Sequence, residues 1–181
     1  MDQVDDRRAE GDDLDRLRAR VARLEAREEV LDCFREYLYA LDGGRVDDLL
    51  DVFTEDVTFE AVNFPPGSGE TVARAGREAL AGLYGRYPAS IRRHHAANTS
   101  VEVGEGGDTA ELSSYYLTTG AYELAGGLYE GTFRRDGGRW RIARWRVTSQ
   151  WGWRLREERP PYLADPLDRG TMRGGRPAAG C

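Results

Sequence analysis

Residues 37–57 read YLYALDGGRVDDLLDVFTEDV, and this stretch fixes the order of the first structural elements. Its first residues continue a helical apolar spacing, which Gly43 and Gly44 end because two consecutive glycines are a strong stop signal for a helix. Residues 46–53 then predict a second, short helix. The alternation of apolar and polar residues over 57–62 predicts a strand.

The chain before this stretch carries the same helical spacing. Apolar residues recur there at steps of three and four: Leu14, Leu17, Val21, Leu24, Leu31, Phe34, Leu38 and Leu41. The spacing predicts one long helix or two helices in line. The first half either forms a coiled-coil-like arm or packs on its own domain, since two heptads are short for a stable coil. Both interpretations favour a homo-oligomer.

After residue 76 the spacing of apolar residues changes once, from helical spacing to strand-like alternation. Residues 77–87 predict a third helix, closed by Pro88. Four β-rich runs follow, separated by glycine-rich turns: residues 94–103, 109–122, 127–135 and 140–153. Three helices followed by four antiparallel strands predict an α+β fold in which a curved sheet wraps over the helices.

Composition and charge indicate where the folded domain begins and ends and which partners are unfavourable. We expect a disordered arm at 1–12, one domain at 13–155 and a flexible tail at 156–181. The formal net charge of -6 argues against nucleic acid as a partner. We find no export signal and no membrane-spanning stretch, and Cys33 and Cys181 do not resemble a disulfide framework. We therefore expect a cytoplasmic protein.

His94 and His95 are the only histidines, so any proton transfer through an imidazole uses one of them. All 26 cationic residues are arginine, which excludes a lysine base or a Schiff base. Two adjacent residues of a regular strand cannot both face one metal ion, and no nucleotide-binding or nucleophile motif is present. We expect chemistry without a metal or another cofactor.

Three stretches together resemble the SnoaL-like proteins of the nuclear transport factor 2-like superfamily. They are residues 37–57, residues 94–98 with 107–110, and residues 128–133 with 138–144. The resemblance implies a cone-shaped α+β barrel with the N-terminal helices packed in a curved antiparallel sheet. It is closest to the scytalone dehydratase and bile-acid dehydratase type.

That type uses a tyrosine, an aspartate and a histidine in one deep pocket, which Tyr37, Asp42 and His94 match here. Aligned with the register of Val101 and Val103, the family's histidine falls on His94. A slip of one residue would exchange it with His95, because neighbouring strand residues face opposite sides.

The resemblance implies a cofactor-independent dehydratase acting on a hydrophobic cyclic or polyketide-like molecule. Asp42 would orient His94, His94 would take a proton from carbon, and Tyr37 would donate to a carbonyl or to the departing hydroxyl. Tyr37 lies about 140° from Asp42 around an ideal helix, so the two share a pocket only if it spans a wide arc or the helix end deviates. Isomerisation, cyclisation and a non-catalytic binding protein stay open as alternatives.

Six further side chains are expected to bind the substrate: Phe59, His95, Asn98, Tyr116, Tyr129 and Trp145. Each candidate residue also has a structural interpretation. Asp42 could bind only local amides at a helix end, and either histidine could be an ordinary strand residue. Tyr116 and Tyr129 could be core. Asn98 could only end a bulge. Trp145, Trp151 and Trp153 share strand parity, which suggests a subunit interface.

Overall fold

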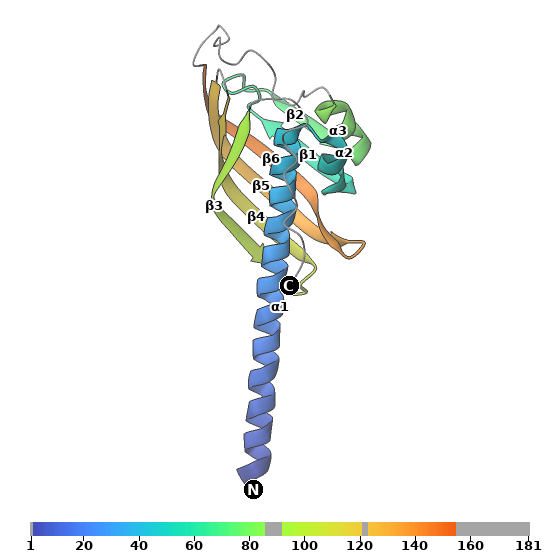
Figure 1. Ribbon diagram of the computed structural model, residues 1–181, viewed down its shortest axis with the longest axis vertical. Helices are drawn as coiled ribbons and strands as arrows, with labels where there is room; N and C mark the ends of the chain where they lie inside the picture. Colours follow the sequence, from blue (N-terminus) through green and yellow to red (C-terminus); the bar gives the residue numbers. More distant parts are fainter. Residues whose placement is uncertain (1, 86–91, 121–122, 155–181) are drawn as a thin grey trace.

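A single long helix projects from the body of the protein in the computed structural model, which describes residues 2–85, 92–120 and 123–154 (Figure 1). This helix, α1, spans Asp2–Gly43, so one helix forms where the sequence allowed one or two. It includes residues 2–12, which were expected to form a disordered arm. Ion pairs one turn apart support its first half, including Arg16–Asp13 at 3.3 Å and Arg18–Asp15 at 3.1 Å.

Two short helices follow along the chain, α2 at Val46–Asp51 and α3 at Arg77–Tyr84. The last residues of the helix expected over 77–87 lie outside the described residues, as does the expected tail at 156–181.

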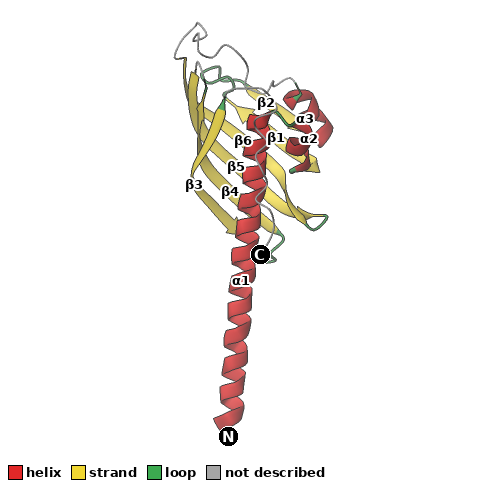
Figure 2. Ribbon diagram, in the orientation of Figure 1, coloured by secondary structure: helices red, strands yellow, loops and turns green. Residues whose placement is uncertain are grey.

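Six strands form one curved sheet around the C-terminal half of α1 (Figure 2). They are β1 (Phe53–Val62), β2 (Thr71–Ala75), β3 (Arg93–Val103), β4 (Thr109–Thr119), β5 (Glu123–Asp136) and β6 (Arg139–Arg154). The order across the sheet is β2-β1-β6-β5-β4-β3. The predicted α+β cone is confirmed, with the four consecutive strands in antiparallel order.

The sheet departs from a purely antiparallel one at a single pair. Strand β6 runs parallel to β1, with Phe59 opposite Trp145. Parallel neighbours need a long connection, and the chain between these strands supplies it. Strand β2, which the sequence did not predict, pairs with the other edge of β1.

The core lies between α1 and the inner face of the sheet. Helix α1 buries residues at helical spacing: Ala26, Val30, Cys33, Phe34, Tyr37 and Ala40. The strands bury large side chains against them, including Phe53, Tyr129, Phe133, Ile142 and Trp145. Burial thus begins at Ala26, and every residue from 11 to 25 is exposed.

The second of two bulges in β6 separates the tryptophans that the sequence placed on one face. The register with β5 shifts at Ala143 and again at Gln150, and each extra residue reverses the alternation of faces. Trp145 therefore points inward at 0% exposure, whereas Trp151 and Trp153 lie on the outer face at 47% and 71%. The prediction that the three tryptophans share one face was wrong because strict alternation was assumed through the bulge at Gln150, which lies between Trp145 and Trp151.

No helix among the described residues is both long and apolar enough to cross a membrane.

Candidate active site

Asp42 is available for chemistry because the backbone of its own helix end is satisfied without it. Gly44 has a left-handed φ of 62°, its N–H donates to the Leu41 carbonyl at 3.2 Å, and the Arg45 N–H donates to the Ala40 carbonyl at 3.0 Å. These two bonds form a glycine-based helix cap. The interpretation of Asp42 as a ligand for local amides finds no support in this arrangement.

A bulge at Asn98 decides which histidine faces inward. Strict alternation from the buried Val101 would put His95 on the inner face. However, Asn98 and Thr99 of β3 together face one residue of β4, and Asn98 has a φ of 53°. The extra residue reverses the alternation. His94 pairs with the buried Thr118, and His95 lies outside.

Asp42 and His94 meet through two contacts. The Nδ1 atom of His94 lies 2.6 Å from Oδ1 of Asp42, and the His94 backbone N–H donates to Oδ2 at 3.1 Å. Both side chains are largely buried, at 13% and 12% exposure. With both carboxylate oxygens occupied, neither group can rotate freely. Within the described residues Nε2 has no hydrogen-bond partner, so it is the ring nitrogen left for proton transfer.

A cluster of aromatic rings lies beside this pair. Tyr37 packs on Trp145 at 5.0 Å between ring centroids and on Tyr129 at 6.1 Å. Burial raises the pKa of the Tyr129 phenol well above its ordinary value, with further contributions from Tyr37, Tyr116 and Asp42. Tyr129 thus packs on Tyr37 and also feels the charge of Asp42, so both residues of α1 act on the same buried ring.

The far wall of this cluster is polar. Tyr116 stacks on Tyr129 at 4.5 Å, and its hydroxyl lies 3.2 Å from Oγ of the buried Ser149. Burial raises the pKa of Tyr116, so its phenol stays neutral and can donate a hydrogen bond. Gly127 keeps this arrangement possible, because a Cβ there would collide with the Thr148 carbonyl oxygen and lie 2.9 Å from the Tyr116 ring.

The structure brings some predicted site residues together and leaves others apart. Asp42 pairs with His94, and Tyr37, Tyr116, Tyr129 and Trp145 form a ring cluster on which the charge of Asp42 acts, giving one neighbourhood. Phe59 is buried beside Tyr84 at 6.0 Å. His95 is exposed on the outer face, where Nε2 lies 3.1 Å from Oγ1 of Thr119. Asn98 is exposed at the bulge. Its backbone conformation, rather than a contact of its side chain, shapes the site.

Two residues of this neighbourhood were missed by the sequence reasoning. Ser149 is buried opposite Tyr116 only because the bulge at Ala143 moves odd-numbered residues of β6 inward. Arg92 lies close enough to oppose the rise in the pKa of Tyr129. A polar residue in an apolar strand is a weak signal for Ser149, and nothing in the sequence distinguishes Arg92 from its arginine neighbour.

We expect the bulge to tolerate glycine and to reject a β-branched residue. Asn98→Val should lower the free energy of unfolding by about 1 to 3 kcal/mol, because valine strongly disfavours a positive φ. It should also impair activity by displacing His94. Asn98→Gly should leave the free energy of unfolding and the activity close to those of the unmodified protein. Urea denaturation and turnover assays check this, and equal effects of the two substitutions would contradict it.

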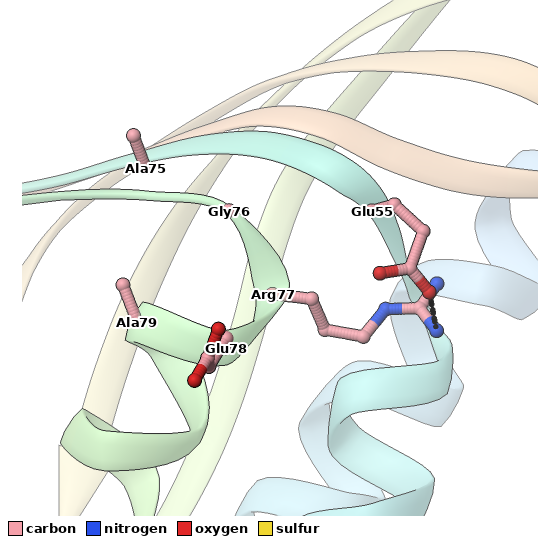
Figure 3. Close-up of a pocket in the computed structure, with 6 residues that line it drawn as sticks. All are labelled: Glu55, Ala75, Gly76, Arg77, Glu78 and Ala79. Atoms are coloured by element: carbon pink, nitrogen blue, oxygen red, sulfur yellow. Dashed lines mark ion pairs between the residues drawn. The ribbon is translucent and has the colours of Figure 1, made fainter.

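A shallow hollow lies elsewhere on the surface, at the junction of β1, β2 and the start of α3 (Figure 3). It is lined by Glu55, Ala75, Gly76, Arg77, Glu78 and Ala79. Arg77 crosses it to Glu55, with 2.7 Å between Nη1 and Oε1. It shares no residue with the Asp42–His94 neighbourhood, so we do not assign the chemistry to it.

Cys33 offers no alternative nucleophile. Burial, with a smaller contribution from Glu36, raises the pKa of its thiol to about 12. A thiol with that pKa is protonated near neutral pH, and the thiolate is the reactive form. No group of three potential metal ligands among His, Cys, Asp and Glu occurs in the described part of the chain.

Comparisons with known proteins agree with this architecture. The profile of the SnoaL-like domain matches residues 22–146. No curated protein matches the chain. A solved structure of an NTF2-like protein with a cystatin-like fold from Novosphingobium aromaticivorans is 27% identical, with a TM-score of 0.61, over 76% of this chain and 90% of its own.

Two further solved structures share the fold at lower identity. One is a proposed scytalone dehydratase from Novosphingobium aromaticivorans, 18% identical with a TM-score of 0.62, covering 76% of this chain and 93% of its own. The other is the hexachlorocyclohexane dehydrochlorinase LinA-type3 from Novosphingobium barchaimii, 18% identical with a TM-score of 0.63, covering 78% and 99%.

Proposed function

This chain belongs to the SnoaL-like domain family, and we propose that it is a cofactor-independent lyase that eliminates water from a hydrophobic cyclic, polyketide-like small molecule. The two-point attachment of His94 to Asp42 is the observation that carries this proposal. The names of two structural neighbours, a dehydratase and a dehydrochlorinase, describe eliminations and support the same reaction class.

The pair is arranged for general base catalysis. Asp42 accepts the Nδ1 proton of His94, which leaves the lone pair on Nε2 to accept a proton. In the proposed reaction Nε2 takes a proton from a carbon next to a carbonyl group, and the electron pair of the broken C–H bond forms an enolate. The fixed carboxylate stabilises the imidazolium that results.

Loss of the leaving group completes the reaction. The enolate reforms the carbonyl, a carbon–carbon double bond forms, and the bond to the β-hydroxyl breaks. The hydroxyl leaves as water after receiving a proton from the imidazolium or from a tyrosine. Tyr37 is the proposed tyrosine, and it lies beside Tyr129 in the aromatic cluster. A neutral phenol donates a hydrogen bond to the carbonyl oxygen as negative charge develops there.

The aromatic cluster supports a hydrophobic, ring-containing substrate. Tyr37, Tyr116, Tyr129 and Trp145 pack on one another into a buried aromatic cluster, and a wall of such rings favours an apolar, ring-containing ligand. The Trp145 Nε1 atom is buried without a hydrogen-bond partner among the described residues. Phe59 extends the apolar surface along β1.

Incubation with a panel of cyclic β-hydroxy ketones in D₂O tests the proposal. Loss of water, followed by mass spectrometry, supports elimination, and deuterium uptake next to the carbonyl, followed by NMR, reports the base step on its own. Uptake without loss of water would instead favour isomerisation or cyclisation, which begin with the same enolate. Binding without uptake in any compound would favour a binding protein.

Asp42→Asn should lower kcat/KM by about 10² to 10⁴, because an amide cannot stabilise the imidazolium and can hold the wrong imidazole tautomer. The ¹⁵N shifts of the His94 ring should report that change of tautomer. Asp48→Asn is the matched control, since Asp48 also carries a carboxylate near the end of α1 but pairs with the exposed Arg45. Equal activity of the two variants would contradict the role of Asp42.

A further inference from the structure

The first half of α1 exposes a row of large apolar side chains. Leu14, Leu17, Val21 and Leu24 are between 44% and 57% exposed. Figure 1 shows this part of the helix extending away from the sheet. Nothing among the described residues of the same chain covers the row, and an apolar row of this kind marks a surface for association.

The row lies on the side of the helix opposite the core. Val21 and the fully buried Val30 are nine residues apart, which is about 180° around an ideal helix. The sheet therefore cannot bury the row, because it packs on the other side of α1. The alternative in which the first half packs on its own domain is not what the structure shows.

The row has the spacing of a two-stranded coiled coil. In a heptad repeat written abcdefg, Leu14 and Val21 occupy a positions, and Leu17 and Leu24 occupy d positions. Val21, one of the two a residues, is β-branched and both d residues are leucine, a combination that favours two strands over three. The next a position is Glu28, so the repeat of apolar residues ends near the point where the body begins.

Charges beside the row specify how two copies would align. In a parallel pair each g residue faces the e residue five positions later in the partner helix. The g positions hold Asp13, Arg20 and Arg27, and the matching e positions hold Arg18, Glu25 and Asp32. All three combinations join opposite charges.

An antiparallel pair is less favourable. If the four apolar residues of each row pair in that orientation, Arg20 of one helix faces Arg20 of the other. The two Arg18 side chains face each other in the same way. Like charges at these positions repel. The parallel alignment has no such conflict.

We propose that residues 13–27 of two copies of this chain form a parallel, in-register coiled coil. The expected homo-oligomer is thereby a dimer joined through its arms, with each sheet held on the outer side of its own helix. The inference does not depend on the proposed reaction, because none of these residues belongs to the Asp42–His94 neighbourhood.

Oxidative cross-linking tests the alignment. Leu14→Cys, in a chain that also carries Cys181→Ser, should form a covalent dimer because the two a positions face each other in the parallel pair. In the antiparallel pair the two sulfur atoms would be about 15 Å apart along the axis, too far to bond. Ala19→Cys at the f position is the matched control and should stay monomeric on denaturing gels. Equal cross-linking of both variants, or none for Leu14→Cys, would overturn the proposal.

A charge exchange tests the pairing without changing the apolar row. Arg20→Glu should weaken the dimer about three- to ten-fold in sedimentation equilibrium, and adding Glu25→Arg should restore it. The two residues are five apart and do not meet on one helix, so restoration reports contact between chains. Arg23→Glu, at the outer c position, makes the same charge change and should have little effect. Loss in all three variants, or in none, would show that the arms do not pair in this register.

Discussion

His94→Ala should lower turnover by about 10² to 10⁴, the usual loss for a missing general base. The Nε2 atom of His94 is the proposed proton acceptor, and its ring is held by the 2.6 Å contact with Asp42. Circular dichroism should show an intact fold, because the ring keeps part of its surface in solvent. Steady-state kinetics on a substrate found in the β-hydroxy ketone panel measure the loss.

His95→Ala is the matched control for this substitution. His95 is the neighbouring residue, has the same side chain, and lies on the outer face of β3. Its removal should leave kcat/KM nearly unchanged. The reverse outcome, with activity lost only when His95 is replaced, would mean that the outer face carries the chemistry.

Trp145→Ala should reduce the free energy of unfolding by about 3 to 5 kcal/mol. The indole is fully buried and packs on rings of Phe34, Tyr37, Tyr129 and Phe133, so its removal leaves a cavity at the centre of the core. Chemical denaturation followed by circular dichroism measures the change. A loss below about 1 kcal/mol would place Trp145 in a flexible site rather than in the core.

Trp145→Phe distinguishes packing from hydrogen bonding at the same position. Phenylalanine keeps much of the apolar contact and removes a buried N–H that has no partner among the described residues. We expect a much smaller loss of stability than for alanine.

The local patterns of the sequence predicted the elements well. Helical spacing up to Gly43 and Gly44 predicted the end of α1, and alternation with glycine-rich turns predicted β3 to β6. These features depend on neighbours in the chain, so they can be read from it. Strand β2 and the parallel pairing of β1 with β6 depend on contacts between distant segments, and neither was predicted.

At the site, alternation in the sequence was not enough to tell which side chains of a strand point inward. A period of two assigns faces only while the strand stays regular. One extra residue near Asn98 decides between His94 and His95, and extra residues at Ala143 and Gln150 decide that Trp145 and Ser149 point inward while Trp151 points outward. Whether an asparagine ends a bulge depends on the partner strand, which the sequence of one strand does not contain.

The sequence by itself determined the family, the succession of helices and strands, and the residue types available for chemistry, namely two adjacent histidines and no lysine. Only the tertiary structure joined the end of α1 to β3 and so placed Asp42 against His94, 52 residues apart. The physical reason is that periodicity is a property of neighbouring residues, whereas a catalytic pair requires a fixed distance between segments that only the packed core holds together.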